Sequence, residues 1–322
     1  MTDGRHEYGE PPLILRPPTA GTSLPTWART HRSEIRESIL DAGAILFQGF
    51  ADVTVDSFAE TIRALAGEPL SYTERSSPRR LVAGGVYTPT DHPPGERIFL
   101  HNEQSYNVTW PLHIFFHCAV APGSGGATPI ADTRRVYSRL SEEVRSRFEK
   151  SGYAYVRNFG HGMGLTWQEA FQTDDRSEVE RYCRENRIGF QWIAENRLTT
   201  RQIRPAVAAH PRTGEPLWFN HLTFFNIATL GGELAEDLIR YLGPDRLPNN
   251  TYQADGSEIE PWVLDELRSA YEAETVEFPW EAGDVLMLDN MLMAHGRAAF
   301  TPPRQIVVGM AEPCSAADGH GD

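Results

Sequence analysis

The sequence predicts a mainly β protein, an antiparallel sandwich or jelly roll with inserted helices. Short runs rich in aromatic and β-branched residues, typical of strands, gather in residues 98–120 and again in 284–313. Amphipathic patterns typical of helices lie between these regions, so helices are expected to cover one side of the stacked strands. The sequence contains no Gly-rich strand–turn–helix fingerprint, so a dinucleotide-binding or P-loop fold has no support.

The N-terminal part of the chain is expected to be an extended arm followed by the first helices and strand of the domain. Residues 1–26 are rich in proline, glycine and polar residues and predict an extended arm. Two amphipathic helices are expected at 33–43 and 55–65, on either side of a short apolar strand. We see no internal repeat and no clear break after the arm. Residues 27–322 are therefore expected to form a single jelly-roll domain.

Residues 71–97 contain many turn-forming residues and few periodic apolar positions. A loop of this length in a compact domain is usually functional or disordered, and as a functional loop it is a candidate lid. A helical insertion is expected around 166–275, and residues 166–200 are expected to be mainly helical, with Thr166 as a cap. The other expected elements are strands at 98–108, 110–120, 152–159, 216–227, 284–290, 293–300 and 304–313, and helices at 141–150, 231–243 and 261–275.

Composition limits the classes of partner. The chain has 44 acidic and 30 basic residues, a formal net charge of −14, which argues against nucleic acid because duplex binding needs a basic surface. The three cysteines form neither a disulfide framework nor a CxxC metal clip. No apolar run approaches the ~20 residues of a membrane span, and the N-terminus lacks the apolar core of a signal peptide. We expect a cytoplasmic protein; the sequence leaves its oligomeric state open.

A histidine and a glutamate in the first strand region are candidate metal ligands. In a strand, residues i and i+2 project to the same face, so His101 and Glu103 could share one ion. Such a pair also occurs by chance on surface strands that face water. The best third ligand is His295, in MLMAHGRAAF. Two histidines and one carboxylate on one face of an octahedron leave positions for a chelating co-substrate and O₂, as in non-haem iron(II) oxygenases.

Arg304 follows His295 after the turn-prone sequence TPP. If that turn reverses the chain, Arg304 begins a neighbouring strand close to the metal. A guanidinium there could bind the distal carboxylate of 2-oxoglutarate in a bidentate pair. The alternative is a surface arginine on an edge strand, against which the apolar run IVVGM argues. Thr128, after the turn SGGA, could add a hydroxyl to the same carboxylate or be an ordinary turn residue.

Several of these segments together resemble a known family. The run HNEQSYN…WPLHIFFHC…GGATPIADTRR, then WFNHLTFF, then GDVLMLDNMLMAHGR and PPRQIVVGMAEP, is similar to the TauD/TfdA superfamily of oxygenases. The likeness extends in order from about residue 30 to residue 313 and is greatest to the SyrP-type branch of natural-product pathways, several members of which hydroxylate amino acids. It implies a double-stranded β-helix (clavaminate synthase-like or cupin-like), iron(II) at His101, Glu103 and His295, and 2-oxoglutarate at Thr128 and Arg304.

Two positions distinguish this chain from other branches of the superfamily. Taurine enzymes carry a substrate-binding arginine four residues after the co-substrate arginine, and the corresponding residue here is Val308. A small sulfonate substrate is therefore not expected. Halogenase relatives lack a carboxylate at the position of Glu103, so its presence argues against halogenation.

Four residues are candidates for contact with the substrate. The resemblance places Arg97 near the substrate, where it could pair with a carboxylate or phosphate; a loop arginine in solvent is the alternative. Tyr106 follows the first two ligands. Asn220 and His221 lie in the WFNH segment, although an aromatic strand of this kind is more often part of a core.

The expected activity is that of a 2-oxoglutarate-dependent dioxygenase. Iron(II), 2-oxoglutarate and O₂ would yield succinate, CO₂ and an oxidant that hydroxylates an unactivated C–H bond. The resemblance implies an amino acid or amino-acid-derived substrate, either free or tethered to a carrier protein, in a biosynthetic pathway. The alternatives are desaturation or epoxidation by the same oxidant, a different metal enzyme on a cupin-like barrel, and a non-enzymatic jelly-roll module.

Overall fold

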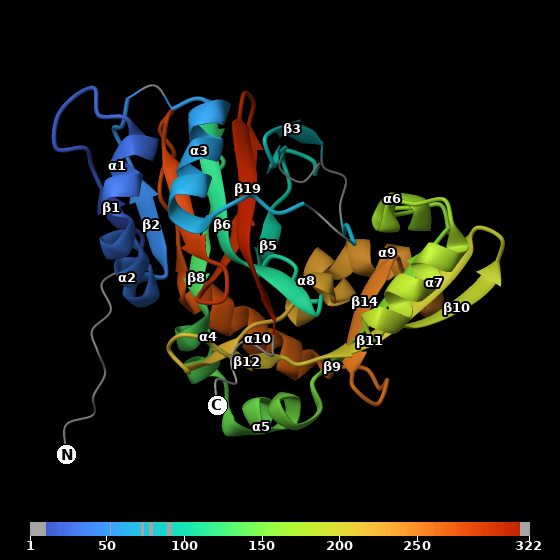
Figure 1. Ribbon diagram of the computed structural model, residues 1–322. Coiled ribbons are helices and arrows are strands. Elements are labelled where there is room, and N and C mark those ends of the chain that lie inside the picture. The colour runs from blue at the N-terminus through green and yellow to red at the C-terminus, as the bar shows by residue number, and fades with distance from the viewer. Residues whose placement is uncertain (1–10, 52, 72–73, 77–79, 89–91, 316–322) are drawn as a thin grey trace, which may run out of the picture.

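Two β-sheets packed face to face form the centre of the structure, a computed structural model that describes residues 11–51, 53–71, 74–76, 80–88 and 92–315 (Figure 1). The mainly β prediction is confirmed. The larger sheet has the order β1 (Leu13–Leu15), β2 (Ala44–Phe47), β16 (Val285–Asp289), β6 (Thr109–Val120), β19 (Gln305–Ser315), β4 (Val86–Tyr87) and β3 (Leu81–Ala83). The smaller sheet has the order β15 (Thr275–Val276), β8 (Ile130–Asp132), β17 (Met293–Arg297) and β5 (Ile98–His101).

Strand alternation decides which side chains face the space between these sheets. In β6, Ile114 and Phe116 pack with residues of the smaller sheet, and the ring of Phe116 lies 5.1 Å from that of His295. Phe115 and His117 point to the opposite face, where the ring of His117 lies 5.5 Å from that of Phe58. The larger sheet therefore has two apolar faces, one toward the second sheet and one toward helices.

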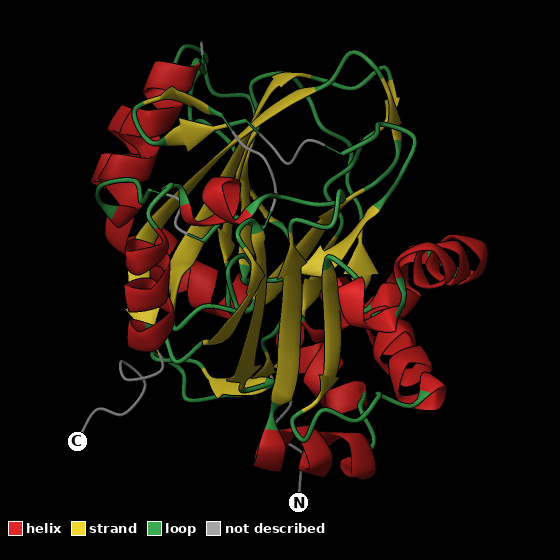
Figure 2. Ribbon diagram, turned by 90° about the vertical axis from the view of Figure 1, so that its right-hand side faces the viewer, coloured by secondary structure: helices red, strands yellow, loops and turns green. Residues whose placement is uncertain are grey.

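Helices flank the sheets on both sides (Figure 2). In Figure 1, α1 (Leu24–Thr30), α2 (Arg32–Ala42) and α3 (Val55–Ala66) lie beside the larger sheet, and α6 (Trp167–Phe171) and α7 (Arg176–Glu185) lie at the other side of the molecule. The remaining helices are α4 (Thr133–Arg139), α5 (Glu142–Ser151), α8 (Leu222–Phe225), α9 (Gly232–Leu242), α10 (Pro261–Ala273) and the 3₁₀ turns η1 (Ile227–Leu230) and η2 (Pro244–Arg246). Among the helices described, none is both long enough and apolar enough to cross a membrane.

The insertion contains more strand than the sequence suggested. Helices α6 and α7 form where expected, and Thr166 caps α6 in a capping box with Glu169. Residues 189–200, part of the stretch 166–200 expected to be mainly helical, instead belong to a hairpin of β10 (Gly189–Ala194) and β11 (Arg197–Arg204). In β11 buried and exposed residues alternate, the period of a strand. These strands join a sheet of order β10-β11-β9-β14, with β9 at Tyr153–Phe159 and β14 at Asn249–Gln253.

Three further expectations need correction. The run 216–227 is a strand only in β13 (Pro216–Trp218), which pairs with β12 (Val207–Ala209); the chain then turns into α8. The expected loop 71–97 includes the β3–β4 hairpin, whose β4 pairs with β19 at the edge of the larger sheet. Residues 72–73, 77–79 and 89–91 of that loop lie outside the described residues. In the expected arm, β1 pairs with β2, and the predicted boundary at residue 26 falls inside α1.

A charged cluster ties α2 to the larger sheet. Arg36 donates to both carboxylate oxygens of Glu312, at 2.8 and 2.9 Å, and Nδ1 of His113 lies 3.1 Å from Glu312 Oε2. Burial alone would raise the pKa of Glu312, but the hydrogen bonds from His113 and Arg36 outweigh it and hold that pKa well below its usual range. The ionised carboxylate therefore stabilises the folded state.

Glu312→Gln is predicted to lower the free energy of unfolding at pH 7 by about 1 to 2 kcal/mol, since it weakens charge-assisted hydrogen bonds. Because the folded-state pKa is depressed, this stabilisation is present above the unfolded pKa of about 4.3 and is lost as the pH falls toward the folded value. Urea unfolding at pH 7, 5 and 3.5 should show the wild type and variant converging in acid. Glu60→Gln, at an exposed site on α3, is the control. A difference independent of pH would contradict the assignment.

Candidate metal centre and co-substrate pocket

The first two predicted ligands lie at the end of β5 and in the turn that follows it. β5 ends at His101, so Glu103 is not in the strand that the i, i+2 argument assumed. The side chain of Asn290 holds this turn: its Oδ1 accepts from the Glu103 amide at 2.7 Å, and its Nδ2 donates to the Glu103 carbonyl at 2.9 Å. Asn102 also donates to the Asn290 carbonyl, at 2.7 Å.

The third predicted ligand comes from the neighbouring strand. β17 pairs with β5 in antiparallel register, with His295 opposite His101, and the two imidazole rings lie 4.6 Å apart. The register shifts directly after His295, where Gly296 approaches the partner strand. A Cβ at Gly296 would lie 2.6 Å from the Ile98 carbonyl oxygen, so only glycine fits without movement of the backbone.

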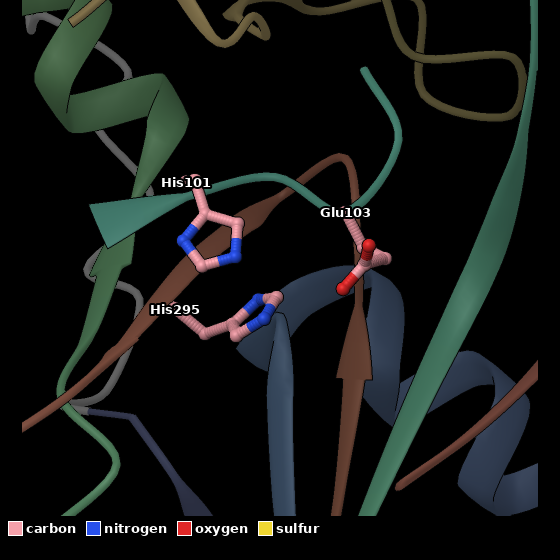
Figure 3. A group of neighbouring side chains, drawn as sticks. All are labelled: His101, Glu103 and His295. Atoms are coloured by element: carbon pink, nitrogen blue, oxygen red, sulfur yellow. The ribbon is translucent and has the colours of Figure 1, made fainter. Parts of the chain in front are cut away.

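The three side chains converge in one buried space (Figure 3). One potential ligand atom from each of His101, Glu103 and His295 lies within 4.8 Å of the others. All three residues are buried, and they are the only such group of potential metal ligands in the part of the chain that the structure describes. Nδ1 of His101 lies 2.9 Å from the Phe99 carbonyl, to which it donates, so the lone pair resides on Nε2. Two imidazoles and a carboxylate are a donor set suited to iron(II).

A pocket adjoins the triad between the two sheets. Its lining residues come from β5, β17, the larger sheet and the segment before β8: Ile98, His101, Phe116, Thr128, His295, Gly296, Arg297, Arg304, Ile306 and Val308. No acidic side chain is among them, whereas two arginines are. The pocket therefore offers its positive charges to an anion.

The two terminal guanidinium nitrogens of Arg304 are available to a ligand in this pocket. Its Nε donates to the Gly126 carbonyl at 2.9 Å, whereas Nη1 and Nη2 make no hydrogen bond within the described chain. Burial and the neighbouring Arg297 lower the pKa of Arg304 to about 10, so the guanidinium remains charged at neutral pH. A carboxylate between the two terminal nitrogens would form the bidentate pair that guanidinium geometry favours.

Arg297, which the sequence analysis missed, directs both terminal guanidinium nitrogens at backbone carbonyls, whereas its buried Nε has no hydrogen-bond partner among the described residues. Its guanidinium donates to the carbonyls of His92, Pro93 and Glu96 at 3.0, 2.6 and 2.8 Å. It therefore fastens residues 92–96 to the strand that carries His295. The ring centroid of Phe300 lies 5.1 Å from the guanidinium carbon of Arg297 and 5.3 Å from that of Arg304. No local sequence pattern indicates these contacts, because the bonded residues are about 200 positions apart.

The four candidate substrate residues lie outside the lining of this pocket. Arg97 is exposed on the segment that Arg297 fastens. Tyr106 is buried and its hydroxyl donates to the Glu74 carbonyl at 2.9 Å; Asn220 donates to the Ala206 carbonyl at 2.8 Å. These bonds favour a structural role for Tyr106 and Asn220 over substrate contact.

His221 lies beside His101, one of the predicted metal ligands. Its ring is 5.3 Å from that of His101, and its Nδ1 is 2.6 Å from the hydroxyl of Ser105. Burial and the neighbouring His101 hold the pKa of His221 well below its usual range, so its imidazole is neutral. Phe224, a residue that the sequence analysis did not single out, lies with its ring 4.4 Å from that of His101 and is only half-buried.

Comparison with known proteins identifies the family. Residues 12–311 match the model of the taurine catabolism dioxygenase TauD, TfdA family. The dapdiamide synthesis protein DdaC of Enterobacter agglomerans is 38% identical over 316 residues, 96% of this chain and 95% of that protein. A clavaminate synthase-like protein of Arabidopsis thaliana is 28% identical over 96% of both chains.

The fold agrees with solved structures. The crystal structure of PvcB from Pseudomonas aeruginosa has a TM-score of 0.56 at 18% identity, covering 93% of this chain and 85% of that one. A putative taurine dioxygenase from Burkholderia xenovorans has a TM-score of 0.54 at 18% identity, covering 94% and 90%. The predicted double-stranded β-helix is thereby confirmed. The chain belongs to the TauD/TfdA family of iron(II)- and 2-oxoglutarate-dependent dioxygenases.

Proposed function

We propose that this dioxygenase binds iron(II) through His101, Glu103 and His295 and anchors the distal carboxylate of 2-oxoglutarate on Arg304 and Thr128. We further propose that it hydroxylates a C–H bond of an amino acid or amino-acid-derived substrate. One observation carries the site assignment: a buried His–Glu–His cluster borders a pocket in which a charged guanidinium has both terminal nitrogens uncommitted.

Each of these side chains has a defined task. Iron(II), with O₂ and 2-oxoglutarate, supplies an oxidant for C–H bonds while the co-substrate is decarboxylated to succinate. The two histidines and Glu103 would hold the ion through two imidazole nitrogens and a carboxylate. Arg304 and Thr128 hold the far end of the co-substrate, so that its 2-oxo acid end is aligned on the metal. Apolar neighbours such as Phe116 and Val308 keep water from the pocket.

The substrate proposal rests on the relatives and on one pocket residue. The 38% identity to a dapdiamide synthesis protein supports a biosynthetic role. The amino-acid substrate is proposed from the sequence resemblance to the SyrP-type branch, several members of which hydroxylate amino acids. Val308 contributes an apolar side chain to the pocket where taurine enzymes have an arginine. An amino acid tethered to a carrier protein fits this proposal as well as a free one.

A cytoplasmic location is part of the proposal. Its support is the state of the cysteines: Cys118, Cys183 and Cys314 are all buried and free. Free, buried thiols are usual in proteins of a reducing compartment, where disulfides are rare.

Arg304→Ala is predicted to weaken 2-oxoglutarate binding by about 30-fold or more, because it removes one partner of a buried charge pair. Anaerobic protein with iron(II) should develop a weak visible charge-transfer band when 2-oxoglutarate is added. In the variant this band should need a correspondingly higher 2-oxoglutarate concentration. Arg240→Ala, at an exposed arginine of α9 paired with Asp237, is the matched control and should titrate like the wild type.

Two outcomes of that titration would contradict the proposal. Absence of the band in the wild type would mean that iron(II) and 2-oxoglutarate do not meet in this protein. An unchanged titration of Arg304→Ala would mean that the distal carboxylate binds elsewhere.

Gly296→Ala is predicted to reduce the affinity for iron(II) about tenfold or more. The added methyl must displace β5 or β17 and so separate the two histidines, a strain of the size usual for overpacking. Calorimetric titration with iron(II) under argon measures the effect, and circular dichroism confirms folding. Gly232→Ala, at a helical site with open space, is the control. Wild-type affinity in Gly296→Ala would show that the close approach of these strands does not set the metal site.

Succinate release should increase when the correct amino acid, free or carrier-tethered, is supplied, because substrate binding couples 2-oxoglutarate turnover to C–H oxidation. Taurine should not increase it, since Val308 offers no charge to a sulfonate. The test is a screen that measures succinate release with free amino acids, with carrier-tethered amino acids and with taurine. Coupled turnover of taurine, with none of any amino acid, would overturn the substrate proposal.

A further inference from the structure

Trp280 lies directly behind the co-substrate pocket without being part of its lining. It is 6% exposed, packs in the core between the two sheets, and meets the ring of Phe278 edge-on with 5.5 Å between ring centroids. Its indole Nε1 donates to Oγ1 of Thr128 at 3.1 Å. The two residues are 152 positions apart in the chain, and the sequence analysis singled out only Thr128.

The indole fixes the direction in which the threonine hydroxyl can act. An indole N–H can only donate, whereas a hydroxyl can donate once and accept twice. Thr128 Oγ1 is therefore the acceptor in this pair, and its own hydrogen is left for a second partner. That hydrogen has no acceptor within the described residues, and Thr128 borders the pocket. The hydroxyl is thus presented to the pocket as a donor.

The backbone around Thr128 is held in place as well. The Gly296 amide donates to the Pro129 carbonyl at 2.9 Å, and the Ala298 amide donates to the Ala127 carbonyl at 3.0 Å. Both bonds attach Thr128 to the chain that carries His295. The main freedom left to the hydroxyl is rotation of the Thr128 side chain, and the bond from Trp280 restricts it.

We propose that Trp280 is a positioning residue, which holds the Thr128 hydroxyl as a hydrogen-bond donor toward the distal carboxylate of 2-oxoglutarate and so sets the affinity for the co-substrate. This inference rests on the proposed co-substrate pocket and deepens it. A carboxylate between Arg304 and Thr128 accepts from both residues. Because a carboxylate only accepts, a hydroxyl already oriented as a donor binds it without reorientation.

Trp280→Phe tests the proposal, since it removes the indole N–H and keeps an aromatic ring in the core. We expect the Kd for 2-oxoglutarate, from anaerobic calorimetry on iron(II)-loaded protein, to rise roughly three- to tenfold, the worth of one hydrogen bond. The Kd for iron(II), and kcat at saturating 2-oxoglutarate, should not change. Pyruvate, a 2-oxo acid without a distal carboxylate, should bind wild type and variant equally.

The matched control is Trp110→Phe. Trp110 is also 6% exposed and belongs to the same core, but its Nε1 has no hydrogen-bond partner in the described structure. The Trp110→Phe variant should leave the Kd for 2-oxoglutarate unchanged. Trp280→Met, which fills the site with a flexible apolar chain, is a second variant should Trp280→Phe fold poorly, and it should give the same rise in Kd.

A double-mutant cycle with Thr128→Val decides whether Trp280 acts through the threonine. If it does, Trp280→Phe has no further effect in the Thr128→Val background. Additive losses, an equal loss of pyruvate binding, or an unchanged Kd in Trp280→Phe would each overturn the proposal. Failure of the co-substrate pocket itself is a different result, in which wild-type protein binds no 2-oxoglutarate or Arg304→Ala binds it normally.

Discussion

The antiparallel register of β17 and β5 places His295 directly opposite His101, and the geometry of the site follows from this pairing. Residues directly opposite each other in such a ladder point to the same face at about 5 Å, close enough for one ion. Gly296 permits the approach, because any side chain there would meet the partner backbone. Asn290 then binds the turn after β5 and brings Glu103 to the same space. His295, from late in the chain, thus joins the early pair His101 and Glu103 in one donor set.

The two faces of the larger sheet have different functions in the structure. The inner face contributes apolar side chains such as Phe116 and Val308 to the pocket, whereas the outer face packs on α1 to α3. His113 and His117 lie on that outer face, which separates them from the metal site although they are only a few residues from Phe116. Position in the strand period, not closeness in sequence, determines which histidine can bind the ion.

The jelly roll and the three candidate metal ligands could be predicted from the sequence, because strands and metal ligands have recognisable local residue patterns. The structure places these three residues together. The HxE pair was found by a strand argument, although Glu103 lies in a turn. Contacts without a local period could not be predicted: Asn290 to Glu103, Arg297 to residues 92–96 and Trp280 to Thr128 each join distant segments. Most of the β10–β11 hairpin lies in the stretch 166–200, predicted to be mainly helical, because its strand alternation went unrecognised beside α7.

Charge balance explains why the pocket suits a dicarboxylate in the proposed complex. Iron(II) with Glu103 and two neutral histidines carries one net positive charge, and Arg304 adds a second. The charge of Arg297 is offset by the nearby Glu96, and its terminal nitrogens bind three backbone carbonyls. A dianion with one end on the metal and the other on Arg304 cancels both charges. A monocarboxylic 2-oxo acid would leave the Arg304 guanidinium partly desolvated and without a counter-charge, so the pocket selects for the second carboxylate.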